Sequence, residues 1–397
     1  MPEFFPFRAT RHAPAWVSHA ADLWAPPYDV LSTADRERLA AAHEHNIVHV
    51  DVPVPPGAVP RPEAYAAAAA RLAAWRTHGV LVTDAAASYT IVRTSFVDAE
   101  GRARTTVGVM GALRIEAPDS TEVRPHERTT PKDSTDRLDL TRATRAQLSP
   151  VWGLSSARGL TDLLVAPGQL VGEATDADGV LHRYERVDDA ARLAQIARLA
   201  GSAPVVIADG HHRYAVSRHY RDEPDAPPAA RSVLTHLGEL VEDQLAVAAI
   251  HRLFTAPDAA TLETALRAAC EPREMGPMPA DVIARMSREG CMVMLRADGT
   301  ALGLTPRSGA FPGVRDLDSA RLEHALAGVG AEAAYQHGLD RVRARLARGE
   351  AVAAVLIRPV GIGEILRTAR EGALMPPKST FFAPKLRTGP VLRLLDD

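Results

Sequence analysis

The residue types best suited to chemistry are concentrated in one short segment, residues 207–214. A carboxylate, a glycine, two imidazoles and a guanidinium follow one another there, as Asp209, Gly210, His211, His212 and Arg213. A carboxylate can bind a metal ion or abstract a proton, imidazoles titrate near neutral pH, and a guanidinium matches phosphate or carboxylate. A glycine lets the backbone approach a ligand closely. We therefore expect this segment to be an active or ligand-binding centre.

The position of this segment favours an anion as its ligand. Residues 204–208 form an apolar run typical of a buried strand, and a helix is predicted to begin near Tyr214. Free backbone N–H groups and the helix dipole favour an anion at such a junction. The alternative is a charged turn in which only Asp209 acts, as the cap of the helix.

A transition-metal site is not expected at the two histidines. Neighbouring side chains in extended backbone point to opposite faces, so His211 and His212 would not easily bind one ion. A third ligand would also have to come from elsewhere in the chain. The carboxylate of Asp209 remains as the candidate metal ligand.

A second cluster of charged side chains lies between residues 124 and 137. It contains Arg124, His126, Glu127, Arg128, Lys132, Asp136 and Arg137. Guanidinium and ammonium groups beside carboxylates could form a phosphate clamp with a carboxylate base. The alternative is a solvated basic loop that leads into a helix beginning near Thr135.

Lysines, hydroxyl groups and a glycine recur in the segment 376–389. Lys378 and Lys385 are its candidates for anion binding. The segment lacks the glycine spacing of a P-loop, so it is not assigned to that class. The alternative is a segment that packs through Phe381 and Phe382.

The elements that must position these side chains alternate between helices and strands. Predicted helices cover residues 33–46, capped by Ser32 or Thr33, residues 62–78, ended by Gly79, residues 188–200 and, as several helices, residues 315–350. Predicted strands cover residues 47–52, 88–97, 104–115, 204–208, 231–240, 245–254 and 351–357, with hairpin turns at 98–101 and 298–299. We expect a mixed α/β protein with an N-terminal region (1–87), a central region (88–255) and a C-terminal region (256–397).

Composition narrows the class of protein. The 397 residues carry a formal net charge of −3, which implies no general attraction to nucleic acid or membranes. The two cysteines, Cys270 and Cys291, are too few for a disulfide framework and fit a reducing compartment. No stretch reaches the roughly 20 apolar residues of a membrane span, and residues 1–11 lack the apolar core of a signal peptide. A soluble, cytoplasmic protein is expected.

Several motifs together resemble one large bacterial and archaeal family, domain of unknown function 1015. The motifs are the turn 26–30, with Tyr28 and Asp29, the stretches 126–129 and 136–138, the loop 207–214, the pair His251-Arg252, and the segment 378–389. The resemblance runs essentially from end to end. In addition, the segment from Asp188 to about Tyr220 resembles the phosphate-binding loop of the ParB/sulfiredoxin fold, which includes free-serine kinases. This likeness implies a ParB/sulfiredoxin-like central region between flanking α/β lobes.

The resemblance implies a kinase-like phosphotransferase that uses ATP or ADP with Mg²⁺ on a small hydroxylated metabolite such as free serine. Its implied catalytic residues are Glu127, Asp209 and His212, with Asp209 also the Mg²⁺ ligand. Its implied phosphate- or nucleotide-binding residues are Arg124, His126, Arg128, Lys132, Arg137, Gly210, His211, Arg213, Lys378 and Lys385.

Two other classes remain open. One is a hydrolase or lyase with His126 or His212 as general base. The other is a nucleotide-binding regulator without chemistry, against which stand the negative net charge and the lack of a helix-turn-helix signature. The expected partners are a small-molecule substrate and a nucleotide, without membrane or nucleic acid, and a homodimer is left open.

Overall fold

The computed structural model describes residues 1–55, 57–59, 61–98, 101–117, 120–125, 132–376 and 378–396, without the side chains of 132–135, 369 and 370. The chain forms two compact units. Unit 1 comprises Met1–Ala246 and Pro384–Asp397, and unit 2 comprises Val247–Ala383. Residues 1–87 and 88–246 therefore share a unit, whereas the division into three regions stays a prediction. Within the described ranges, no helix is both long and apolar enough to cross a bilayer.

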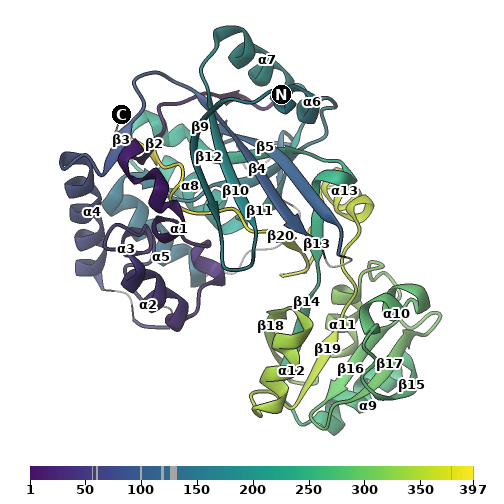
Figure 1. Cartoon of the computed structure of the whole chain (residues 1–397). Coiled ribbons are helices and arrows are strands. Elements are labelled where there is room, and N and C mark those ends of the chain that lie inside the picture. The colour runs from purple at the N-terminus through teal and green to yellow at the C-terminus, as the bar shows by residue number, and fades with distance from the viewer. Residues whose placement is uncertain are drawn as a thin grey trace. The chain divides into compact units, whose positions relative to one another are not determined.

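A nine-stranded sheet forms the framework of unit 1, as far as the structure describes it (Figure 1). Its order is β6 (Val123–Pro125), β11 (Val205–Asp209), β8 (Val151–Ser155), β12 (Ser232–Glu239), β5 (Ala103–Arg114), β4 (Tyr89–Val97), β10 (Leu181–Val187) and β9 (Gln169–Thr175), with β1 (Phe4–Phe5) on β5. The pairs β6–β11 and β8–β12 are parallel, and the other pairs are antiparallel.

The predicted hairpin of residues 88–115 is confirmed as β4 and β5, which pair antiparallel. Asp98 N donates to Arg102 O at 2.9 Å, and Gly101 has a φ of 78°, a conformation that glycine adopts without strain. The alternating apolar residues of these strands face a core that also includes helices α6 (Leu160–Val165) and α7 (Ala190–Ala200). Leu160 and Leu164 of α6 and Ile196 and Ala200 of α7 are buried in this core.

Short helices from the N-terminal part of the chain are grouped together beside the sheet (Figure 1). They are α1 (Ala20–Leu23), α2 (Thr33–Ala42), α3 (Val48–Asp51) and α4 (Pro62–Thr77), with the 3-10 turns η1 (Pro14–His19) and η2 (Tyr28–Val30) and the strand pair β2 (Thr10–His12) and β3 (Leu81–Thr83). Two predicted helix ends are confirmed. Ser32 and Asp35 form a capping box at the start of α2, and Gly79, with a φ of 70°, follows α4.

The predicted strand over residues 47–52 is wrong, because this run forms α3. Asn46 Oδ1 accepts a hydrogen bond from Val48 N at 2.9 Å, and Asp51 N donates to Ile47 O at 2.8 Å. Ile47, Val48 and Val50 are fully buried. A short, mostly apolar run does not distinguish strand from helix by its periodicity. Here the hydrogen bond from Val48 N to the side chain of Asn46 favours the helix.

The rest of unit 1 joins these helices to the sheet. It contains α5 (Lys132–Thr144), α8 (His211–Arg221), the 3-10 turns η3 (Pro228–Arg231) and η4 (Glu242–Gln244), and the strand pair β7 (Ala146–Gln147) and β21 (Arg393–Leu394). Strand β21 belongs to the C-terminal segment, which also pairs through Leu392 with Thr10 and through Thr388 with Ala25. Chain ends distant in sequence thus build one unit.

Unit 2 is built on a six-stranded antiparallel sheet, as far as its residues are described. The order is β15 (Cys270–Pro277), β17 (Thr300–Pro306), β16 (Met292–Arg296), β19 (Ala353–Leu356), β14 (Ile250–Ala256) and β18 (Glu332–His337). Its helices are α9 (Ala259–Ala269), α10 (Val282–Glu289), α11 (Asp318–Ala325), α12 (Leu339–Ala347) and α13 (Ile362–Arg370), and β13 (Ala246–Ala248) pairs with β20 (Phe381–Ala383). The mixed α/β class is confirmed.

Strand β18 corrects the prediction of helices from Arg315 to Glu350. Its sequence, Glu332 to His337, includes two alanines and a glutamate, which favour helix in isolation. Pairing with β14 along the edge of the sheet overrides that preference. The strand predicted over 245–254 is likewise divided into β13 and β14, whereas the strand at 351–357 and the turn at Asp298-Gly299 are confirmed.

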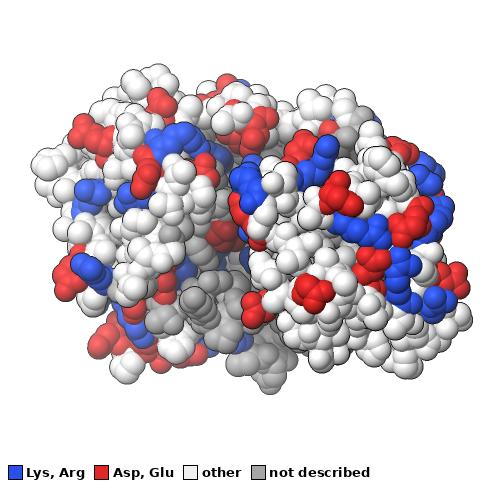
Figure 2. Space-filling model, turned by 90° about the horizontal axis from the view of Figure 1, so that it is seen from below, with Lys and Arg blue, Asp and Glu red and all other residues white. Residues whose placement is uncertain are grey.

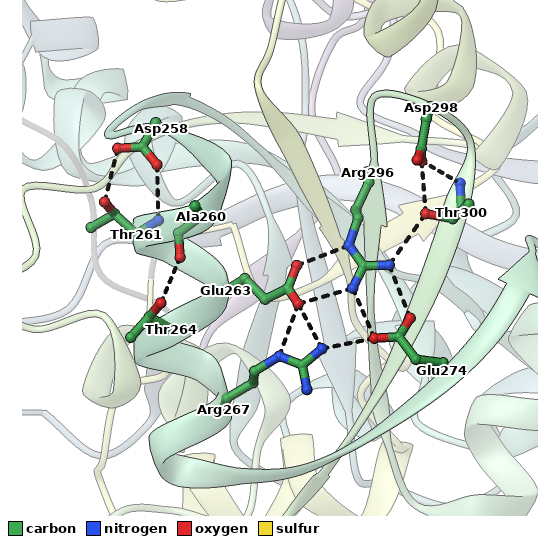
Figure 3. A network of polar contacts seen from close by, with 10 residues as sticks. All are labelled: Asp258, Ala260, Thr261, Glu263, Thr264, Arg267, Glu274, Arg296, Asp298 and Thr300. Carbon is green, nitrogen blue, oxygen red and sulfur yellow. Dashed lines mark hydrogen bonds and ion pairs between the residues drawn. The ribbon is translucent and has the colours of Figure 1, made fainter.

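Charges of both signs are interspersed on the face of the molecule in Figure 2. One ordered example is the network of ion pairs between α9, β15 and β16 in unit 2 (Figure 3). Arg296 lies between two carboxylates, with Nε 2.8 Å from Glu263 and Nη1 3.0 Å from Glu274. Arg267 pairs with the same two glutamates at 2.7 Å. This network connects the helix to the sheet through side chains that are half-buried or exposed.

Candidate functional site

The loop between β11 and α8 makes an abrupt turn at one residue. Gly210 is the N-cap of α8, with a left-handed φ of 84°, and the helix begins at His211, three residues before the predicted start. The left-handed glycine allows the strand to pass directly into the helix. The two histidines therefore lie in the first helical turn, about 100° apart around its axis, and not in the extended backbone that was assumed.

Asp209, the last residue of β11, is held by two cations. Arg213 Nη2 donates to Asp209 Oδ2, and Lys385 Nζ donates to Oδ1 at 2.5 Å. Burial alone would raise the pKa of Asp209, but the positive charges of Lys385 and Arg213 outweigh it and hold that pKa well below its usual range. Both oxygens of this carboxylate are thus engaged, and the ionised form is stabilised.

Arg213 folds back from the first turn of α8 over the loop. It is 8% exposed, and its Nη1 donates to the carbonyl oxygen of Pro150. A Cβ atom at Gly210 would lie 3.0 Å from both Cζ and Nε of Arg213. The glycine is therefore required twice, for the turn of the backbone and for the space that the guanidinium occupies.

Arg137, on α5, forms a second buried cationic centre. Its Nε donates to Asp136 Oδ2 at 2.8 Å, and its Nη1 donates to the carbonyl oxygen of Asp51 at 2.7 Å and to Asp51 Oδ1 at 3.3 Å. The guanidinium carbon lies 4.3 Å from the ring centre of Tyr28, a cation–π distance. The hydroxyl of Tyr65 donates to Asp136 Oδ1 at 2.5 Å. Arg137 is thus fixed from several sides.

One pocket of unit 1 brings the two arginines together. It has a volume of about 50 Å³, room for a few water-sized groups. Its charged lining residues are Asp51, Arg137 and Arg213, its other polar lining residues are Thr141, Gln147, Ser149 and Ser217, and its apolar lining residues are Leu140, Ala146, Leu148, Val216 and Val233. Two clusters that are separate in the sequence thus contribute to the wall of one polar pocket.

Residues 4–320 match the family described as "Protein of unknown function (DUF1015)". The chain belongs to this family. The residues of the DUF1015 protein that match include Asp209, Gly210 and Arg213, whereas Lys385 lies beyond them. No curated protein matches the chain.

Several solved structures are similar to the DUF1015 protein at low identity. Free serine kinase in complex with AMP is 13% identical, with 69% of this chain and 88% of that chain covered and a TM-score of 0.41. A conserved hypothetical protein from Pyrococcus furiosus is 12% identical, with 69% and 93% covered and a TM-score of 0.41. SbnI from Staphylococcus aureus, truncated at its C-terminus, is 12% identical, with 71% and 86% covered and a TM-score of 0.40.

The other predicted site residues of the DUF1015 protein have different positions. Arg124 lies on β6 opposite Val206 of β11, and its Nε donates to Thr121 O at 2.6 Å. His126, Glu127 and Arg128 lie outside the described residues. Lys132 is the first residue of α5, and its side chain is not described. Lys378 belongs to unit 2, where its φ is 56°, as does the pair His251-Arg252, on β14.

Asp51 is the pocket residue that the sequence prediction missed. The sequence predicts a strand at this residue, but Asp51 ends α3 and is 2% exposed. Burial raises the pKa of its carboxyl group above the usual range, although Arg137 and Arg213 oppose this shift. The available signal was a single carboxylate among the valines of the run Val48 to Val52.

Proposed function

We propose that this DUF1015 protein is a nucleotide-dependent phosphotransferase that acts on a small hydroxylated metabolite, such as free serine, with ATP or ADP and Mg²⁺. The observation that carries the proposal is the pocket lined by Arg137 and Arg213, since it places two guanidiniums beside hydroxyl-bearing side chains. Guanidinium groups bind phosphate oxygens through paired hydrogen bonds.

The start of α8 supports the same assignment. Free backbone N–H groups and the positive end of the helix dipole favour an anion at this position. His211 and His212, in the first turn, would add side-chain donors to a bound phosphate. Lys385 lies within hydrogen-bonding distance of the same loop through Asp209.

Phosphoryl transfer requires mainly positioning and charge stabilisation, which such a site supplies. In this proposal, Gly210, His212 and Arg213 hold the transferred phosphate, while Arg137, together with Arg128 and Lys132, neutralises the remaining charge. Glu127 or Asp209 would bind Mg²⁺, while a carboxylate of the site activates the hydroxyl.

The described residues could bind Mg²⁺ only together with the phosphates of a bound nucleotide. The described residues contain no group of three or more histidine, cysteine, aspartate or glutamate side chains that could hold a metal ion. Mg²⁺ commonly retains water and binds through one or two carboxylates together with substrate phosphates. Asp209 would supply the carboxylate, through an oxygen that it shares with Lys385 or Arg213, and the ion would add charge neutralisation of the phosphates.

The direct test incubates the protein with ATP or ADP, Mg²⁺ and a pool of amino acids, and detects phosphorylated products by mass spectrometry. Calorimetry measures nucleotide binding in parallel. The Arg213→Met variant is expected to bind nucleotide at least about tenfold more weakly. The matched control is Arg198→Met, at an exposed arginine on α7 outside the pocket. Absence of both product and nucleotide binding would refute the proposal.

The two alternative classes give different results in the same assays. A hydrolase or lyase would turn over substrate without nucleotide, and its pH–rate profile would contain an imidazole titration that His212→Ala removes. A regulator would bind nucleotide without forming product and would shift DNA on a gel.

A further inference from the structure

The carboxylate of Asp51 is the least satisfied charged group in the pocket. Its Oδ1 accepts a hydrogen bond from Arg137 Nη1 at 3.3 Å. Its Oδ2 is buried and has no hydrogen-bond partner among the residues that the structure describes. A buried polar atom without a partner costs free energy, so a ligand that donates a hydrogen bond would be stabilised at this oxygen.

The surroundings of Asp51 fix its orientation. Arg137 donates both to its side chain and to its carbonyl oxygen, so that helix α3 and helix α5 are joined at this residue. The same arginine is held in turn by Asp136 and lies over the ring of Tyr28. Arg137 therefore acts as a positioning residue that occupies one carboxylate oxygen of Asp51 and leaves the other without a donor.

Asp51 and Asp209 differ in their ability to accept a proton. Asp209 pairs with cations through both oxygens, and its pKa is held well below the usual range by Lys385 and Arg213. Burial moves the pKa of Asp51 in the opposite direction. A general base works best when its pKa is near the operating pH, and it needs an oxygen within reach of the proton. The raised pKa of Asp51 and its oxygen without a donor make Asp51 a better proton acceptor than Asp209.

We propose that Asp51 Oδ2 accepts the proton of the substrate hydroxyl, in a pocket that takes the hydroxyl-bearing end of a small hydroxylated amino acid or of a metabolite of similar size. This inference rests on the proposed phosphotransferase function. The pocket volume of about 50 Å³ limits the group that can enter to a few heavy atoms. An ammonium group on such a substrate would also be attracted to the carboxylate.

In the proposed transfer, the substrate oxygen replaces the leaving group of the nucleotide at the terminal phosphorus. The substrate O–H bond breaks, and its proton goes to Asp51 Oδ2. The substrate oxygen forms a bond to the terminal phosphorus of the nucleotide, while the bond from that phosphorus to its bridging oxygen breaks. ATP leaves as ADP, or ADP as AMP, and the proton passes from Asp51 to water before the next turnover. Arg213 would face the transferred phosphoryl group from the wall of the same pocket.

The test compares Asp51→Asn with Glu239→Gln. Glu239 is a buried carboxylate outside the pocket that accepts hydrogen bonds from Gly159 N at 3.3 Å and Thr161 N at 2.8 Å. Asp51→Asn is expected to lower the rate of phosphoryl transfer by about 100-fold or more, while its Kd for ATP or ADP stays within about threefold of the wild type. Glu239→Gln is expected to keep both. Thermal unfolding followed by circular dichroism checks that each variant is folded.

Chemical rescue separates a catalytic role from a structural one. In Asp51→Ala, added formate should restore part of the lost rate, because a free carboxylate can enter the space that the side chain leaves. If the wild type forms product, two results would overturn the role of Asp51 while leaving the proposed function standing. One is unchanged turnover in Asp51→Asn. The other is a loss of turnover in folded Asp51→Ala that formate does not restore. Absence of product from the wild type would overturn the proposed function and the role of Asp51 with it.

Discussion

Lys385 and Asp209 form an ion pair between residues 176 positions apart in the chain, with Nζ donating to Oδ1 at 2.5 Å. Asp209 ends the strand that leads into the candidate phosphate-binding loop, and Lys385 follows the return of the chain from unit 2 to unit 1. Both side chains are less than one fifth exposed. The C-terminal segment is therefore part of the loop's immediate surroundings.

Replacement of Lys385 by methionine should weaken both the fold of unit 1 and its affinity for nucleotide. The buried carboxylate of Asp209 would keep Arg213 but lose its second cation, at a cost of about 2 kcal/mol in the free energy of unfolding. Urea unfolding measures that loss, and calorimetry with ATP and ADP should show about tenfold weaker binding. Arg145→Met removes a half-exposed ion pair with Asp396 and should cost clearly less stability than Lys385→Met. Equal losses in the two variants would contradict this account.

Gly210→Ala should disturb the site more than its effect on the backbone alone explains. Gly210 and Gly299 have almost the same φ, 84° and 83°. A Cβ at Gly210 would contact Arg213, whereas nothing lies within 4 Å of a Cβ at Gly299. Both alanine variants should lose about 1–2 kcal/mol of stability from left-handed strain. Only Gly210→Ala should also lose nucleotide affinity, which calorimetry measures. If Gly210→Ala and Gly299→Ala bind nucleotide equally well, Arg213 does not need the space above Gly210.

His236 should make the stability of unit 1 depend on pH. Burial lowers the pKa of this imidazole to about 3, and its Nδ1 has no hydrogen-bond partner among the described residues. Between pH 6.5 and about 3 the unfolded chain binds a proton that the folded chain does not, so stability falls as the pH decreases.

The His236→Leu variant tests this linkage. One such group contributes about 1.4 kcal/mol per pH unit to the slope of the unfolding free energy within that window. Urea unfolding of wild type and variant at pH 7, 6 and 5 should therefore give a shallower slope for the variant. Parallel slopes would show that His236 is not the group responsible.

Arg296→Gln should affect unit 2 without reducing nucleotide binding. Hydrogen bonds from Arg296 lower the pKa of Glu263 to about 2, so the pair stabilises the fold above the ordinary glutamate pKa and loses this effect as the pH falls toward 2. The variant should be about 1 kcal/mol less stable at pH 7, and the difference should shrink below about pH 4.5. Arg285→Gln, which removes one exposed pair with Glu289 on α10, should have a smaller effect. A difference that stays constant down to pH 3 would argue against the ion pairs as its cause.

Local signals explain the parts of the fold that the sequence predicted. Ser32 and Asp35 are three residues apart, which is sufficient to define the start of α2. Asp98 and Gly101 define a turn between two β-branched runs, and Gly210 marks the change from strand to helix. Each of these features depends on residues that are neighbours in the sequence.

The features that were not predicted depend on distant contacts. Residues 332–337 form β18 because β14 offers an edge to pair with. Asp51 becomes a pocket residue only because α5 brings Arg137 against α3. The pairing of Lys385 with Asp209 likewise requires that the chain first complete unit 2. The periodicity of apolar residues in the sequence does not indicate such distant partners.

The discontinuity of unit 1 has a consequence during protein synthesis. Residues 384–397 leave the ribosome after all of unit 2, yet they supply Lys385 and strand β21 to a unit whose other residues were made much earlier. Until those residues are made, unit 1 lacks both strand β21 and Lys385. A ribosome-bound chain stalled before Pro384 would therefore carry Asp209 without its lysine, and the loop would reach its final charge balance only after that point in translation.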